Sequence, residues 1–165
     1  MRHAALIAAL LAGCASGTRT AQPDDGRFAG LQSRGAMVMG VDQYSSTHRF
    51  DDRADGGEIT LTRNDTTDRA GAAVILAHLR SVADSFTHGV FVDPATVHGM
   101  TVPGTETMAR KRALISYTVE SRVGGGTLRI RTTDAEAVAA VHAFLAFQRL
   151  DHRAGGHAGH GVGER

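Results

Sequence analysis

The sequence predicts an α+β domain made of a duplicated β-β-α unit, with an antiparallel sheet and two helices packed on one face of that sheet. A pair of strands joined by a glycine turn occurs twice, and each pair is followed by a stretch with helical apolar periodicity. The chain has 165 residues, of which 42% are hydrophobic. That is enough for one folded core and too little for two well-buried domains.

The first copy of the unit covers about residues 45–88. Two strands are expected around the glycine pair 56–57, because glycine supplies the positive φ angles of a tight hairpin and the flanking residues alternate between apolar and polar. Asp65 or Asp68 is expected to cap a helix over 69–87. The apolar residues of this helix form one stripe: Ile75, Leu79, Val82 and Phe86.

The second copy covers about residues 113–152 and repeats the same order of elements. Its two strands flank the glycine run 124–126, and Asp134 is expected to cap a helix over 135–152. A short helix is expected at about 106–112, in the segment that joins the two copies. Aligning the copies matches two pairs of histidines: His78 with His142, and His88 with His152.

The N-terminus predicts export and lipidation. Residues 1–13 have a positive start and an apolar run that is too short to span a bilayer, as in a signal peptide. The run ends in Leu11-Ala12-Gly13-Cys14, which looks like the lipobox of bacterial lipoproteins. This resemblance implies cleavage before Cys14 and a membrane anchor made of acyl chains on that residue. In a cell with two membranes we expect the outer one, facing the periplasm, because Ala15 and not aspartate follows the cysteine.

The composition of the rest of the chain sets the domain limits. Residues 14–36 lack apolar periodicity and predict a flexible tether, and residues 154–165 predict a disordered tail rich in glycine and histidine. The folded domain is therefore expected over 37–153.

Charge and motif content exclude several functions. Lys plus Arg number 18 and Asp plus Glu 17, so the chain lacks the basic excess of a nucleic-acid-binding protein. No Gly-x-Ser-x-Gly elbow, Walker loop, dinucleotide fingerprint or His-Glu-x-x-His motif is present. The single cysteine, Cys14, is assigned to lipid and is not a nucleophile. These observations favour a protein that is not an enzyme.

Nine histidines and five methionines point instead to ligand binding. We expect the matched pair His78 and His142 to face each other where the two helices cross, and to bind a metal ion or share a proton. Imidazole together with thioether is the ligand set that selects copper(I). The expected ligands of a copper-like ion are His48, His78, His142, Met39, Met100 and Met108. His98 is a further, weaker candidate.

Two alternatives stay open at this stage. Each histidine of the matched pair could pack beside the core and bond a backbone carbonyl, and the methionines could fill gaps in the core. His88 and His152 lie near the C-terminal ends of the helices and are expected to cap them. The second alternative is a protein-interaction or assembly module of the cell envelope, whose partner would dock on helix 135–152 if Phe144 and Phe147 form an exposed apolar surface.

The chain resembles a family of bacterial exported proteins and lipoproteins that has no assigned activity. The resemblance covers about residues 37–153. It is carried by Met39-Gly40-x-Asp42-Gln43, Thr47-His48-x-Phe50, His78-Leu79, Pro103-Gly104, Met108 and His142-x-Phe144-Leu145-x-Phe147-Gln148-x-x-Asp151-His152. Arg49 departs from the family, in which a second histidine is expected after His48. The resemblance implies export and a single domain, and it implies no mechanism.

Overall fold

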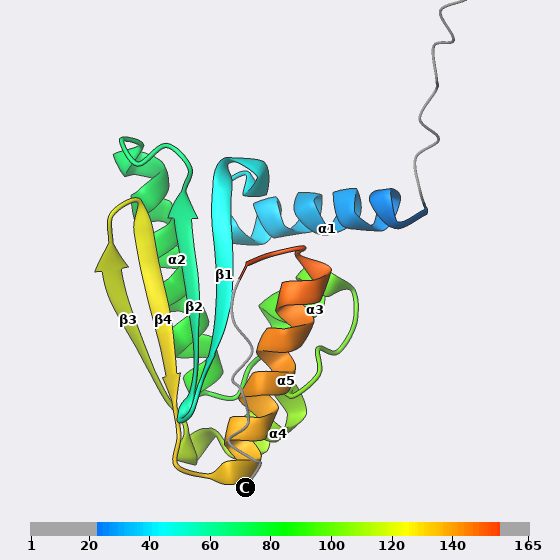
Figure 1. Ribbon diagram of the computed structural model, residues 1–165, viewed down its shortest axis with the longest axis vertical. Coiled ribbons are helices and arrows are strands. Elements are labelled where there is room, and N and C mark those ends of the chain that lie inside the picture. Colours follow the sequence, from blue (N-terminus) through cyan, green and yellow to red (C-terminus); the bar gives the residue numbers. More distant parts are fainter. Residues whose placement is uncertain (1–22, 156–165) are drawn as a thin grey trace, which may run out of the picture.

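The computed structural model describes residues 23–155. The predicted signal peptide and the predicted lipidation site, Cys14, lie outside these residues. The fold is α+β, as predicted: a four-stranded antiparallel sheet in the order β1-β2-β4-β3 is packed against helices (Figure 1). The strands are β1 (Ser46–Arg53), β2 (Gly56–Arg63), β3 (Ser116–Arg122) and β4 (Gly125–Arg131).

Each hairpin leads into a long helix, and both helices begin at the predicted caps. The first is α2 (Arg69–Thr87), where the Asp68 carboxylate accepts a hydrogen bond from the backbone N–H of Gly71. The second is α5 (Ala135–Asp151), where Asp134 accepts from Ala137 in the same way. The order β-β-α therefore occurs twice, as predicted, whereas the duplication itself stays a prediction.

Each long helix packs against the hairpin of the other β-β-α unit and not against the hairpin that precedes it. Helix α2 packs chiefly against β3 and β4, and α5 packs against β1 and β2. The predicted stripe of α2 is buried, and so are Val141 and Leu145 of α5. Gly57 lets α5 approach β2 closely, because a Cβ atom there would collide with the Leu145 side chain. Because of this arrangement, a residue in the middle of α2 and one in the middle of α5 lie over different hairpins.

The segment predicted as a tether is partly helical. Residues 14–36 were expected to be flexible, but α1 (Pro23–Met39) is a helix that crosses above the C-terminal end of α5 (Figure 1). It is held by tertiary contacts and not by a strong apolar stripe. Leu31 is buried, the Arg34 side chain donates to the carbonyl oxygen of Val97 at 2.8 Å, and Arg27 pairs with Asp151 at 2.8 Å.

Short helices fill the remaining connections. They are η1 (Gln43–Ser45), α3 (Val92–His98), α4 (Thr105–Arg110) and η2 (Arg112–Leu114), and α4 confirms the short helix predicted near 106–112. The start of the predicted tail is ordered against β1, since the backbone N–H of Phe50 donates to the carbonyl of Gly155 at 3.0 Å. Within residues 23–155, no helix has both the length and the apolar character needed to cross a membrane.

Candidate functional site

An apolar chamber of about 90 Å³ lies between the helix-covered face of the sheet and helices α1, α2, α3 and α5. Its apolar wall includes core residues of the sheet and of α2, among them Ile59, Leu61, Leu79 and Val82. The chamber exists because α2 and α5 cover different halves of the sheet and leave a gap between them, which α1 and α3 close. We call this cavity the chamber below.

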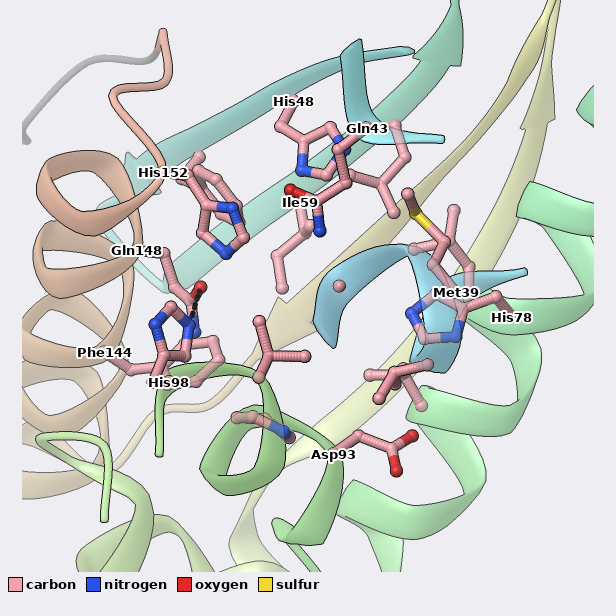
Figure 2. Close-up of a pocket in the computed structure, with 18 of the residues that line it drawn as sticks. Met39, Gln43, His48, Ile59, His78, Asp93, His98, Phe144, Gln148 and His152 are labelled. Atoms are coloured by element: carbon pink, nitrogen blue, oxygen red, sulfur yellow. Dashed lines mark hydrogen bonds between the residues drawn. The ribbon is translucent and has the colours of Figure 1, made fainter. Parts of the chain in front are cut away.

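Four histidines from four different segments line the chamber. His48 comes from β1, His78 from α2, His98 from α3, and His152 follows the last residue of α5. The ring centroids of His48 and His152 are 5.4 Å apart, and those of His98 and His152 are 5.0 Å apart. Figure 2 shows these three rings in a row along one wall, with His78 on the opposite side beside Met39.

Burial keeps the imidazoles of His48, His78 and His152 neutral. Desolvation lowers the pKa of His48 from 6.5 to about 4, with a smaller contribution from the nearby His78. Desolvation also lowers the pKa of His152 to about 3, assisted by repulsion from His48 and His98. The pKa of His78 is lowered by burial too, and Asp93 opposes that shift. At neutral pH each of these three rings therefore offers a nitrogen lone pair.

Two polar atoms at the chamber wall lack a hydrogen-bond partner among residues 23–155. They are Nδ1 of His152 and Oε1 of Gln43, and both are buried. The Gln43 side chain reaches this position because residue 35 in α1 is glycine: a Cβ atom there would collide with the Gln43 amide. A buried polar atom without a partner is costly, so both atoms favour a ligand that bonds them.

His98 is already bonded through both ring nitrogens. Nδ1 donates to the Asp151 carboxylate at 2.6 Å, and Nε2 lies 2.9 Å from Oε1 of Gln148. Asp151 also pairs with Arg27, so the ring is fixed between α1, α3 and α5. Because neither nitrogen is available, His98 serves to position its neighbours in the chamber and is a poor candidate ligand.

The structure brings some of the predicted site residues together and leaves others apart. His48, His78, His98 and Met39 all line the chamber. His142 does not: its Nε2 donates to the carbonyl oxygens of Arg53 at 2.9 Å and Gly56 at 3.0 Å, which holds the turn of the first hairpin. The expected contact between His78 and His142 is therefore wrong, because α2 and α5 pack on different hairpins.

Two of the predicted methionine ligands lie elsewhere. Met108 is fully buried in the core on α4, which fits the alternative that it fills a gap. Met100 is 46% exposed and does not line the chamber. Met39 is the one thioether on the chamber wall among the described residues, and it is buried.

The sequence patterns did not single out several polar residues of the chamber, among them Gln43, Gln148 and His152. His152 was predicted to cap its helix, and its backbone does so, since its N–H donates to the Gln148 carbonyl at 3.0 Å. Its side chain, however, enters the chamber. His88, the matched residue, ends α2 with Nδ1 at 2.8 Å from the Asp84 carbonyl, so the cap prediction is confirmed there.

The apolar surface expected on α5 is absent from the described part of the chain. Phe144 is 2% exposed and belongs to the core, where its ring packs edge-on against Phe86. Phe147 is half-buried and packs against the core and the His98 ring. Phe144 and Phe147 therefore do not form the expected exposed surface, and a protein partner on helix 135–152 stays a prediction.

Over residues 23–155, no group of three or more His, Cys, Asp or Glu side chains is arranged to hold a metal ion. An ion bound at the chamber would therefore be coordinated by two imidazoles together with donor atoms other than those of His, Cys, Asp or Glu. In comparisons with family models, with curated proteins and with solved structures, nothing matches this chain.

Proposed function

We propose that this is a lipid-anchored, non-enzymatic protein of the bacterial cell envelope whose domain binds copper(I) between His48 and His152. The anchor is the acyl-modified Cys14 that the lipobox predicts. The observation that carries the binding proposal is the pair of adjacent, buried imidazoles, one of which has a ring nitrogen without a partner among the described residues.

The spacing of the two rings suits a shared ion. A ring nitrogen lies about 2 Å from a bound transition-metal ion, so two imidazoles on one ion have centroids about 5–6 Å apart. The His48 and His152 centroids are separated by 5.4 Å. Burial also keeps both rings neutral, and a neutral imidazole is the form that binds metal.

The small number of ligands favours copper(I) over zinc. Zinc in proteins takes four ligands in a tetrahedron, whereas copper(I) is stable with two or three soft or borderline ligands. The chamber offers two adjacent imidazoles and the Met39 thioether, and no carboxylate or cysteine completes a three-residue group with them in the described chain. His78 and His142 cannot act as a ligand pair, because His142 lies outside the chamber and bonds the first hairpin turn.

Competition with a copper(I)-specific colorimetric chelator tests this proposal. The protein would carry Cys14→Ser to avoid detergent, and His157→Ala with His160→Ala to remove tail ligands outside the described residues. We expect one copper(I) per chain. Because loss of either imidazole leaves the ion with too few ligands, His48→Ala and His152→Ala should each weaken binding at least 100-fold, in line with loss of a metal ligand.

His88→Ala is the matched control, because that exposed ring bonds only its own helix. Its copper affinity should equal that of the parent protein. Equal affinity of the parent and of the His48→Ala/His152→Ala double variant would eliminate the proposed site. Binding lost on His142→Ala but not on His152→Ala would point back to the matched helix pair.

A further inference from the structure

A second, polar cavity adjoins the chamber and shares part of its wall. This vestibule has a volume of about 250 Å³ and is lined by polar residues that include Gln32, Thr47 and Arg153. Gln43, His48 and His152 line both cavities, so they form the boundary between the vestibule and the chamber. Figure 2 shows the carboxamide of Gln43 beside the rings of His48 and His152. We call these three side chains the gate.

The chamber behind the gate suits a small apolar group. Its volume is about 90 Å³, and an engineered apolar cavity of about 150 Å³ binds benzene. The chamber therefore has room for roughly four carbon atoms. Buried aliphatic residues such as Leu61, Leu79 and Val82 supply dispersion contacts on its wall.

The gate suits a hydroxyl group. Gln43 is 7% exposed, and its Oε1 has no hydrogen-bond donor among the described residues. Nδ1 of His152 is likewise without a partner in that part of the chain. A hydroxyl donates one hydrogen bond and accepts others, so it can bond an amide oxygen and a ring N–H at once. A charged head group is disfavoured inside the chamber because, apart from the histidines, Asp93 is the one titratable side chain among the described residues that line it.

We propose that the chamber and its gate bind a small neutral alcohol, with a carbon body of about four atoms in the chamber and the hydroxyl bonded to Gln43 and His152. This site goes beyond the proposed copper function and does not depend on it. The vestibule is the route by which such a molecule reaches the gate, because its polar wall is continuous with the gate residues.

Titration of the full-length Cys14→Ser chain with a series of straight-chain alcohols, in copper-free buffer and followed by NMR, tests the proposal. Each added methylene from ethanol to 1-butanol should raise the affinity about fourfold, since that is the gain for burying one methylene. Beyond 1-butanol the gain should stop because the chamber is full. Diethyl ether, an isomer of 1-butanol that cannot donate, should bind about fivefold more weakly.

Two variants locate the binding site. Gln43→Leu should lower the affinity for 1-butanol about fivefold, and Val82→Phe should abolish binding by filling the chamber. The control is Thr47→Val, which alters the vestibule alone, because the Thr47 hydroxyl already donates to Asn64, and it should bind as the parent does. An affinity that keeps rising through octanol, or that Gln43→Leu leaves unchanged, would overturn the proposal. The alcohol series on the parent chain decides the matter even if Val82→Phe fails to fold.

Discussion

Replacing His152 by glutamine should make the stability of the domain less sensitive to pH. In the folded protein the pKa of His48 is about 4 and that of His152 about 3, whereas both are near 6.5 in an unfolded chain. As the pH falls through 6.5, His48 and His152 become protonated in the unfolded chain and stay neutral in the folded chain. The unfolded state is therefore favoured, and stability falls as the solution becomes more acidic.

The size of the effect follows from proton linkage. Each histidine that is protonated only in the unfolded state lowers the free energy of unfolding by about 1.4 kcal/mol per pH unit. His48 and His152 together contribute about twice that slope between roughly pH 6 and pH 4. The aspartates with lowered pKa values, such as the helix caps Asp68 and Asp134, act in a separate window near and below their ordinary pKa of 3.8.

Urea denaturation at several pH values between 4.5 and 6 measures this slope, because the histidines of the unfolded chain are mostly protonated there. His152→Gln should remove about 1.4 kcal/mol per pH unit from it, and so should His48→Gln. His88→Gln is the control substitution, because that ring is exposed and lies outside the chamber. An identical slope in the parent and in His152→Gln would show that His152 titrates normally in the folded protein, and the account of a buried neutral pair would be refuted.

Three further substitutions test the contacts around the chamber. Gly35→Ala puts a methyl group into the Gln43 amide and should destabilise the fold by about 1–3 kcal/mol in urea. Gly26→Ala in the same helix, where a Cβ atom meets nothing within 4 Å, should not destabilise it. His142→Ala removes the hydrogen bonds to the first hairpin turn and should cost about 1–2 kcal/mol, with copper affinity unchanged; a loss of copper binding would contradict its structural role. Asp151→Asn removes the carboxylate that pairs with a buried imidazole and with α1, and should cost about 1–3 kcal/mol; unchanged thermal stability would show that this pairing does not hold α1.

The elements whose signals are local could be predicted from the sequence. The hairpins depend on glycine turns with alternating strands, and the two long helices depend on an aspartate cap with an apolar stripe, so both were located closely. Helix α1 could not be predicted, because it is glycine-rich and depends on contacts with α3 and α5 that are distant in the sequence.

The site could be predicted only in part, because the sequence does not tell how distant segments pack together. His48, His78, His98 and Met39 were chosen by residue type, and the structure does gather them at one chamber. The pairing of His78 with His142 failed because alignment of two similar helices does not tell which half of the sheet each helix covers. His152 was assigned to a helix end from its position, and only the tertiary fold reveals that its ring turns inward.

The most direct test of the central claim is a histidine-ring ¹⁵N NMR spectrum of the domain before and after one equivalent of copper(I). We expect the ring nitrogens of His48 and His152 to be neutral at pH 7 without copper and to be the ones that shift when copper is added. The resonances of His88 and His142 should stay in place. Copper-induced shifts confined to other histidines, or imidazolium signals from His48 and His152 at pH 7, would contradict the account.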